Sequence, residues 1–429
     1  MTTSPIALAA DPALPSRDVL LDAQAVREIL TVLDPRGRAR VSACAVVRVN
    51  YQVGRSLRTV LEATVNGEPR IVAARMFRGG KSADAYAQAR RRAVSDGELR
   101  RVAWAPEVET VFWLFPNDRK IHALSAVVDT ASPLPDGVRG RVTRRELVAY
   151  APEKTATVAC LDSGGRALAY AKVAAAHQAG RDFRIYETVG AALGRLDPRL
   201  GLPSALAYWS EQKTLWLEPI HGRRMADPTD GEALTDLRRL GTAVAVFHGL
   251  PASGAPPFDR FAGLHLAADA MLMGRVRPDV ASAADHLADR LASTVAPDRG
   301  ELACLHGDLH PKNAIVSHDR ISLIDLEDVA MGPAGADLGS LLAGLLYLHV
   351  SNRLSRAAYS ACEAEFLAGY AEARPLPDAF SLAWHTAAAL FVERAVRAVT
   401  RIRPLGLAHL RELIAEAERL LDRGVEVAA

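Results

Sequence analysis

Two short segments of the sequence, about one hairpin apart, hold side chains suited to phosphoryl transfer. The first is Leu305-His306-Gly307-Asp308-Leu309-His310-Pro311-Lys312-Asn313, and the second is Leu323-Ile324-Asp325-Leu326-Glu327-Asp328. Phosphoryl transfer from ATP needs a carboxylate that orients a hydroxyl and accepts its proton, and oxygen ligands that hold Mg²⁺ on the phosphates. Asp308 suits the first role. The amide of Asn313 and the carboxylate of Asp325 suit the second, because Mg²⁺ takes few protein oxygens beside phosphate and water.

A purely structural role is the alternative for each of these residues taken singly. His306 and Asp308 would then cap a turn, and Asp325 would end a buried strand. Their joint order and spacing favour phosphoryl transfer, since they match the H-x-D-x-x-x-x-N and Asp-containing segments of kinases. Gly307 stands where protein kinases have arginine, and Leu326 stands where they have an aromatic residue, so the pattern points away from a protein kinase.

The elements that must position these residues change character along the chain. Between about residues 145 and 218, alternating apolar residues predict strands around one helix, and a 3.6-residue period predicts mostly helices afterwards. Pro219 to Gly222 is a break between the two parts. A sheet with one inserted helix, a hinge and a helical lobe is the layout of a two-lobed kinase. The predicted strands are Glu146–Tyr150, Thr155–Leu161, Ala167–Val173, Ser204–Trp209 and Thr214–Glu218, and the helices include Gly180–Leu196, Leu264–Val295 and Phe380–Arg401.

The motif HGDLHPKN resembles the HGDxxxxN signature of the aminoglycoside phosphotransferase and choline kinase-like family, and LIDLEDVAMGPAGADLGSLLAG resembles its metal segment. The resemblance runs from about residue 145 to the C-terminus. It implies an α+β, bilobal protein kinase-like fold with a small five-stranded antiparallel lobe and a large, mainly helical lobe. By this likeness Asp308 is the catalytic base, Asn313 and Asp325 bind Mg²⁺ with Glu327 as a further ligand, and Asp337 is a scaffold residue.

The nucleotide should lie against the small lobe. Lys172 sits among apolar residues of a predicted strand and needs a partner there, for which Glu187 on the following helix is the candidate. The resemblance implies that adenine is held near Glu218 and Ile220 in the hinge. The expected phosphate loop has no glycine, so Lys154 and Thr155 are its candidate phosphate contacts.

The first 140 residues contain a weaker copy of the small lobe. Val49-Asn50-Tyr51 and the residues after it echo the segment that begins at Val148-Ala149-Tyr150, and Arg75 stands where the second copy has Lys172. Chance likeness between two β-meanders is the alternative. A helix is expected over Ala83–Arg101. We predict three domains: an N-terminal α+β cap similar to those of maltokinase-like sugar kinases (1–140), the small lobe with the hinge (141–222) and the helical lobe (223–429). The cap should be inactive and should buttress the small lobe or bridge to another subunit.

Composition limits the remaining choices. The net charge is +2, there is no basic block typical of nucleic-acid binding, and Cys44, Cys160, Cys304 and Cys362 show no metal or disulfide spacing. With no signal peptide and no apolar run that spans a bilayer, a cytoplasmic protein without membrane contact is expected.

We therefore expect an ATP- and Mg²⁺-dependent kinase whose acceptor is a hydroxyl of a sugar, amino sugar, aminocyclitol or antibiotic. A non-catalytic nucleotide-binding scaffold is the alternative. The sequence does not decide the identity of the acceptor, the preference for ATP or GTP, or the oligomeric state. Four arginines lie partly on one helical face near the expected acceptor cleft, where the sequence favours a solvated or salt-bridged surface and leaves an anionic or polyhydroxylated acceptor as the alternative: Arg394, Arg397, Arg401 and Arg403. Acidic residues that suit a cationic acceptor equally well are Glu363, Glu365, Glu393 and Glu412.

Overall fold

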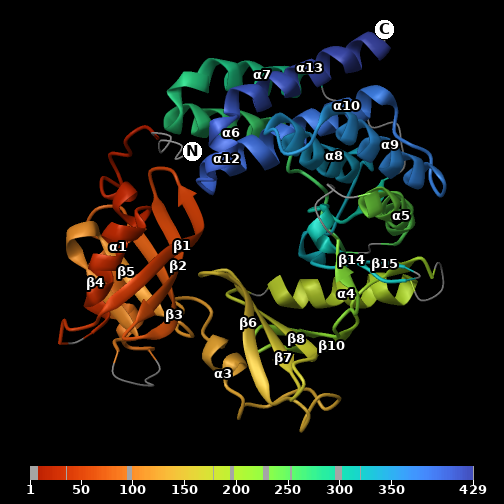
Figure 1. Ribbon diagram of the computed structural model, residues 1–429. Coiled ribbons are helices and arrows are strands. Elements are labelled where there is room, and N and C mark those ends of the chain that lie inside the picture. Colours follow the sequence, from red (N-terminus) through yellow and green to blue (C-terminus); the bar gives the residue numbers. More distant parts are fainter. Residues whose placement is uncertain are drawn as a thin grey trace.

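The computed structural model describes residues 8–34, 36–93, 99–176, 178–193, 198–225, 231–251, 254–294, 302–318 and 320–428. Within them, two five-stranded antiparallel sheets follow one another and lead into a large helical region (Figure 1). The predicted α+β class, with a five-stranded antiparallel lobe and a mainly helical lobe, is confirmed. Among these residues no helix is both long enough and apolar enough to cross a membrane.

The first sheet has the strand order β1-β2-β3-β5-β4. A tight turn at Asn66-Gly67 joins β2 to β3, and both residues have the positive φ that two-residue hairpins favour. The helix expected over Ala83–Arg101 is shorter than predicted: it ends at Arg90, and Val102–Ala105 is a strand. The elements of this region are α1 (Ala23–Ile29), β1 (Val41–Gln52), β2 (Ser56–Val65), β3 (Glu68–Phe77), α2 (Ser82–Arg90), β4 (Val102–Ala105), β5 (Thr110–Leu114) and α3 (Leu124–Val128).

The second sheet has the order β6-β7-β8-β11-β10, which is the order of the first sheet. In both, one helix follows the third strand, and the last two strands add beside that strand. Its elements are β6 (Arg144–Ala151), β7 (Thr155–Leu161), β8 (Ala167–Ala174), α4 (Gln178–Leu193), β10 (Ala205–Trp209) and β11 (Thr214–Leu217). The shared topology is what a duplicated lobe would show, and the division into three domains at residues 140 and 222 stays a prediction.

Helices dominate the chain after residue 230. Two of the predicted helices are interrupted. Pro278 ends the one expected over Leu264–Val295, because proline lacks the amide that the next turn requires. Leu390–Val396 is a π-helical segment inside the other. The helices are α5 (Gly231–His248), α6 (Gly263–Val276), α7 (Ala281–Ser293), α8 (Gly335–Val350), α9 (Arg356–Ala371), α10 (Ala379–Ala389), α11 (Arg397–Thr400), α12 (Pro404–Ala408) and α13 (Leu410–Ala428).

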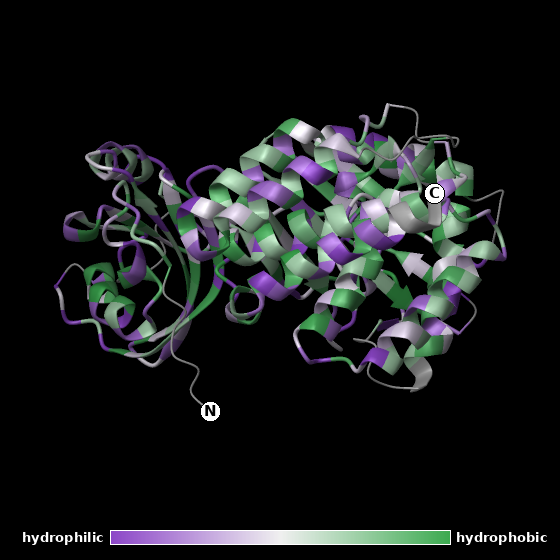
Figure 2. Cartoon of the chain, turned by 90° about the horizontal axis from the view of Figure 1, so that it is seen from above, coloured by the Kyte–Doolittle hydropathy of each residue, from purple (hydrophilic) through white to green (hydrophobic). Residues whose placement is uncertain are grey.

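Amphipathic packing builds the helical region. Figure 2 shows its helices as alternating green and purple bands, as expected when each helix turns one apolar face inward. The central helix α8 is the exception, since its leucines Leu338, Leu341 and Leu345 are almost fully buried. Short strands next to this core carry the loops of the site: β9 (Leu200–Gly201), β12 (Arg223–Arg224), β13 (Ala303–Leu305), β14 (Ala314–Val316), β15 (Ile321–Leu323) and β16 (Ala330–Gly332).

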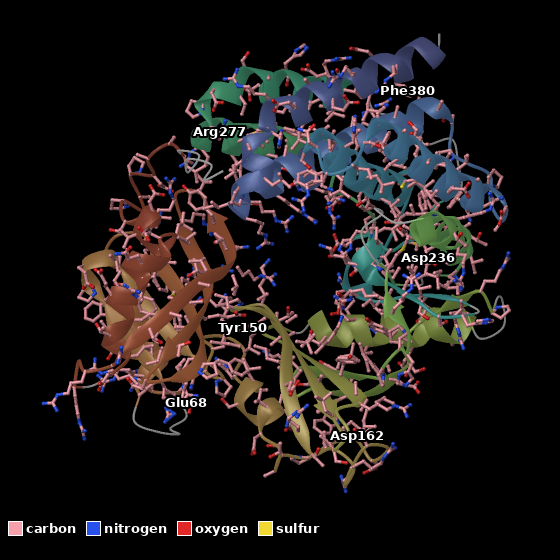
Figure 3. The ribbon with its side chains drawn as sticks, in the orientation of Figure 1. Glu68, Tyr150, Asp162, Asp236, Arg277 and Phe380 are labelled. Atoms are coloured by element: carbon pink, nitrogen blue, oxygen red, sulfur yellow. The ribbon has the colours of Figure 1, made fainter. Side chains whose placement is uncertain are left out.

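The N-terminal region touches both other parts of the chain. The backbone amide of Ala9 donates to the carbonyl of Val276 in α6 at 2.9 Å. On the other side, the hydroxyl of Tyr150 in β6 donates to Asp118 at 2.7 Å. Figure 3 shows Tyr150 where the second sheet meets the first. The N-terminal region therefore bridges the small lobe and the helical lobe.

Candidate active site

A buried carboxylate, Asp337 at the start of α8, fixes the backbone of the loop that carries Asp308. Asp337 accepts hydrogen bonds from the backbone amides of His306 (2.6 Å) and Gly307 (2.9 Å). His248 of α5 lies 3.1 Å from the same carboxylate, and its other ring nitrogen lies 2.9 Å from the hydroxyl of Tyr370. Burial would raise the pKa of Asp337, but its hydrogen bond with His248 and the charge of that ring lower it. Asp337 is thus a scaffold residue, as the resemblance implied.

Gly307 lets this loop approach the segment that follows β15. Its φ is +78°, and a Cβ built on it would lie 2.0 Å from the carbonyl oxygen of Asp328. A side chain at this position would therefore be both strained and blocked. The ring of His306 adds a second link, since its Nε2 lies 2.9 Å from the carbonyl oxygen of Ile324.

Asp308 places its carboxylate beside the guanidinium of Arg397 and the imidazole of His310. Its Oδ1 lies 3.2 Å from Nη1 of Arg397, and its Oδ2 lies 3.6 Å from Nε2 of His310. Burial would raise the pKa of Asp308, but Arg397, His310 and Arg260 outweigh this effect and lower it. Asp308 is therefore ionised near neutral pH, which is the form that can accept a proton.

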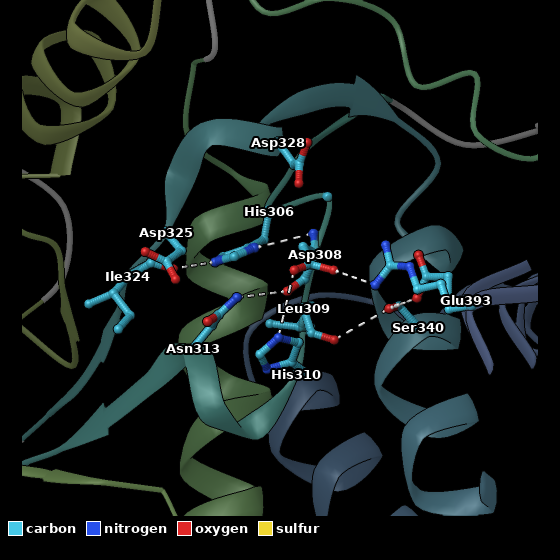
Figure 4. Close-up of polar contacts among 12 residues, drawn as sticks. His306, Asp308, Leu309, His310, Asn313, Ile324, Asp325, Asp328, Ser340 and Glu393 are labelled. Atoms are coloured by element: carbon cyan, nitrogen blue, oxygen red, sulfur yellow. Dashed lines mark hydrogen bonds and ion pairs between the residues drawn. The ribbon is translucent and has the colours of Figure 1, made fainter. Parts of the chain in front are cut away.

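Asn313 and Asp325 lie at neighbouring ends of the hairpin formed by β14 and β15. The backbone amide of Ile324 donates to the carbonyl of Asn313 at 2.9 Å. The Nδ2 of Asn313 donates to the backbone carbonyl of Asp308 at 3.1 Å, which turns the amide oxygen away from that carbonyl. Figure 4 shows Asp308, Asn313 and Asp325 gathered together, so the structure brings the three predicted residues into one place.

The donor chemistry at this place fits Mg²⁺. Asp325 has the left-handed conformation (φ +65°, ψ +58°) that non-glycine residues seldom adopt, which is common at functional sites. Its carboxylate and the amide of Asn313 are hard oxygen donors, which suit Mg²⁺ together with phosphate oxygens. Within the described ranges, no three His, Cys, Asp or Glu side chains group as a metal site by themselves.

Lys172 crosses from β8 to this site. Its Nζ lies 2.5 Å from Oδ1 of Asp325 and also forms an ion pair with Glu327. Burial would lower the pKa of Lys172, but Tyr186 and the two carboxylates outweigh it and raise the pKa. The expected pair with Glu187 is not formed: among the described residues, the ion pairs of Lys172 go to Asp325 and Glu327. Glu187 instead lines a cavity of about 600 Å³ between α4 and residues 200–205.

Asp182 and Tyr186, rather than Glu187, are the residues of α4 that face Lys172. The hydroxyl of Tyr186 accepts the backbone amide of Leu326 at 3.2 Å. Asp182 is buried, and its Oδ1 lies 3.6 Å from Nε of Arg181 without a hydrogen bond to any described residue. Burial and the nearby charge of Glu327 raise the pKa of Asp182 to about 7. The sequence alone could not tell which of Asp182 and Glu187 faces Lys172, because both residues lie on the helix that follows β8.

The turn between β6 and β7 carries the buried Glu153, which follows Pro152. The next two residues, Lys154 and Thr155, are exposed. Glu153 has a φ of +64° and points into the N-terminal sheet, away from the site. Burial lowers the pKa of Lys154, and Arg401 lowers it further. Sequence analysis missed Glu153, because its partners lie far away in the chain.

The hinge leaves the second sheet directly after β11. The backbone amide of Glu218 donates to the carbonyl of Ser204 at 2.9 Å, and the Glu218 side chain is exposed. Ile220 follows in the extended segment and is partly buried. Their proposed contacts with adenine are backbone contacts and remain a prediction.

The π-helical segment Leu390–Val396 supports the other side of Asp308. Its Glu393 is 1% exposed, pairs with Arg260, and accepts the hydroxyl of Ser340 at 2.6 Å. One turn later, Arg397 reaches Asp308. A π-helical turn of this kind is frequent at functional sites and changes which side chains face inward. The sequence showed only a continuous helical period here, so the contacts of Glu393 and Arg397 with the site were not predicted.

Over residues 166–376, just under half of its length, the chain matches the model of the phosphotransferase enzyme family (APH). It is accordingly a small-molecule phosphotransferase that acts on a hydroxyl group. The predicted family resemblance is thereby confirmed.

The chain is also similar to solved structures of kinases, at low sequence identity. One is a choline/ethanolamine kinase family protein from Mesorhizobium loti (15% identity, 72% of this chain and 98% of that chain, TM-score 0.48). Another is choline kinase from Cryptosporidium parvum (10%, 67% and 91%, TM-score 0.49), and a third is aminoglycoside phosphotransferase APH(2'')-Ib bound to ADP (11%, 66% and 96%, TM-score 0.44). A comparison with curated proteins gave no match.

Proposed function

We propose that this phosphotransferase uses ATP and Mg²⁺ and transfers the γ-phosphoryl group to a hydroxyl of a sugar, amino sugar, aminocyclitol or antibiotic. The observation that supports it most is the convergence of Asp308, Asn313 and Asp325 (Figure 4). An ionised carboxylate, an amide oxygen and a second carboxylate are the groups that this reaction requires.

Asp308 is the proposed base. It orients the acceptor hydroxyl and takes its proton while the hydroxyl oxygen forms a bond to the γ-phosphorus and the bond to ADP breaks. Arg397, 3.2 Å away, keeps the carboxylate ionised and holds it in place. The loop that carries Asp308 is fixed by Asp337, so little reorganisation is needed at the moment of transfer.

Asn313 and Asp325 are the proposed ligands of Mg²⁺, with Glu327 as a further ligand. The ion, when bound, would neutralise charge on the transferred phosphoryl group. In the free protein both carboxylates pair with Lys172. Lys172 is the proposed contact of an ATP phosphate, and Asp182 is a further acidic neighbour of its side chain. Lys154 and Thr155 are proposed phosphate contacts, and Glu218 and Ile220 are proposed backbone contacts of adenine.

The test is ADP release by the purified chain with Mg·ATP across a panel of monosaccharides, disaccharides, aminoglycosides, choline and homoserine. We expect turnover with at least one acceptor and a loss of about 10³-fold or more in Asp308→Asn, which removes the base but keeps the shape. Asp136→Asn, at an exposed surface pair, is the matched control. A non-catalytic scaffold would bind nucleotide but turn over nothing in either form.

A further inference from the structure

A group of cationic side chains, most of them without an acidic partner, lies between the N-terminal sheet and the helical lobe. A narrow cleft there is lined by Arg48 of β1, Arg58 of β2, Lys154 of the β6–β7 turn and Arg401 after α11. Its volume of about 30 Å³ suits one small group rather than a whole molecule. Within the part of the chain that the structure describes, no ion pair joins Arg48, Lys154 or Arg401 to a carboxylate.

The positive charges of this cationic cleft repel one another. Burial and the neighbouring Arg48 and Arg397 lower the pKa of Arg401 to about 10. Burial lowers the pKa of Arg48, and Arg403 lowers it further. Three elements from different parts of the chain thus hold like charges together, an arrangement that an anion would stabilise.

Three of the four carboxylates that the sequence offered to a cationic acceptor are engaged elsewhere, and the fourth, Glu412, is exposed. Glu393 is buried against Arg260 and Ser340. Glu363 accepts the hydroxyl of Tyr359 at 3.0 Å, and Glu365 pairs with Arg238 on the surface. Of the two acceptor types that the sequence left open, the structure thus favours the anionic one.

The cationic cleft lies on the acceptor side of the proposed base. Arg397 contacts Asp308, and Arg401 follows four residues later, on the same helical face. Figure 4 shows Asp325 and Glu393 on opposite sides of Asp308, and Arg397 continues the helical segment of Glu393. The phosphoryl donor is expected at Asp325, so a group bound by Arg401 would belong to the molecule on the other side.

We propose that Arg48 and Arg401, which line this cleft beside Lys154, bind an anionic group of the acceptor, so that the acceptor is a hydroxyl compound that already carries a phosphate, sulfate or carboxylate. This inference rests on the proposed function. The phosphates of ATP are the other source of the same chemistry, because Lys154 lies on the turn expected to cover them. The experiment must therefore separate acceptor binding from nucleotide binding.

The first experiment measures binding by calorimetry with inorganic phosphate as the probe, with and without saturating Mg·AMP-PNP. The variants are Arg48→Gln/Arg401→Gln, the charge-preserving Arg48→Lys/Arg401→Lys, and the control Arg36→Gln/Arg38→Gln at exposed positions. We expect the double glutamine variant to bind phosphate about tenfold or more weakly, since two charge-assisted contacts are lost. The lysine variant should keep most of the affinity, and Mg·AMP-PNP affinity should stay unchanged in all.

Two results would overturn the proposal. One is no phosphate binding to the unaltered protein, or equal binding to the glutamine variant. The other is a loss of Mg·AMP-PNP affinity in the glutamine variant together with competition between phosphate and nucleotide, which would assign the cluster to ATP. Failure of the proposed function would look different: Mg·AMP-PNP would not bind, while the phosphate titration without nucleotide would still report on the cleft. The thermal unfolding temperature should not fall in the glutamine variant, because the substitutions remove repulsion between like charges.

The second experiment compares matched acceptors by ADP release: a neutral hydroxyl compound and its phosphorylated or carboxylated form, such as glucose, glucose 6-phosphate and gluconate. We expect kcat/KM to be about tenfold or more higher for an anionic form, and this preference to disappear in the glutamine variant. A preference for the neutral or the cationic compound that the glutamine variant retains would contradict the proposal.

Discussion

Glu153 of the β6–β7 turn forms an ion pair with Arg75 of β3, across the boundary between the small lobe and the N-terminal sheet. Glu153 also lies 2.6 Å from Arg119 and 3.3 Å from Arg58, and its side chain is 3% exposed. Arg75 occupies the strand position that Lys172 has in the second sheet. The N-terminal region thus uses its counterpart of Lys172 to hold the turn that carries the proposed phosphate contacts.

Glu153→Gln should destabilise the protein, because three arginines would lose the carboxylate that they share. Removal of one partner from a buried ion pair costs about 3–5 kcal/mol. Urea unfolding measures the change, and Glu68→Gln at an exposed position of β3 is the control (Figure 3). An unfolding midpoint equal to that of the control would show that the pair does not hold the two parts together.

The same group predicts sensitivity to acid. Burial would raise the pKa of Glu153, but Arg119, Arg75 and Arg58 lower it below the ordinary value of 4.5. The stabilisation that ionised Glu153 gives the folded protein is therefore fully present above pH 4.5. It is lost as the pH falls through the lowered pKa of Glu153. The stability gap between the unaltered protein and Glu153→Gln should shrink as the pH is taken below 4.5. A gap that widens there would contradict this sign.

Asp182→Asn should stabilise the free protein at alkaline pH. The pKa of Asp182 is raised from 3.8 to about 7, so ionisation is resisted in the folded state. The folded state therefore loses stability as the pH rises from about 4 to about 7, and the variant escapes this loss. The midpoints of urea unfolding at pH 4 and pH 8 measure this difference. At pH 4 we expect equal midpoints for the unaltered protein and Asp182→Asn. A variant that is less stable at pH 8 would mean that Asp182 is ionised and paired.

Arg397→Gln should move the acid limb of the pH–rate profile upward. Arg397 lowers the pKa of Asp308, so its removal raises that pKa and leaves less of the base ionised at low pH. The measurement is kcat/KM against pH for any acceptor found, with Arg36→Gln as the control. An acid limb that stays in place would exclude Asp308 as the group that titrates there.

The order and spacing of Asp308, Asn313 and Asp325 made it predictable that these residues come together, because they lie on or next to one short hairpin whose geometry is local. The two-lobed α+β fold followed from the change in hydrophobic period near residue 220. Contacts across long stretches of chain were not predictable. Lys172 pairs with Asp325 and Glu327, more than 150 residues away, and no local spacing distinguished them from Glu187.

Backbone irregularities were equally hidden in the sequence. The π-helical segment that brings Glu393 and Arg397 to the site has the same apolar period as an ordinary helix over its short length. The early end of α2 and the strand β4 follow from packing in the first sheet, which overrode the helical propensity of the arginine-rich stretch.

Calorimetric titration of AMP-PNP, with and without Mg²⁺, into the unaltered protein and Asp325→Asn tests the central claim most directly. The account predicts that Mg²⁺ strengthens binding to the unaltered protein and that this gain falls about tenfold or more in the variant, while binding without Mg²⁺ changes little. An equal gain from Mg²⁺ in both proteins would contradict the account.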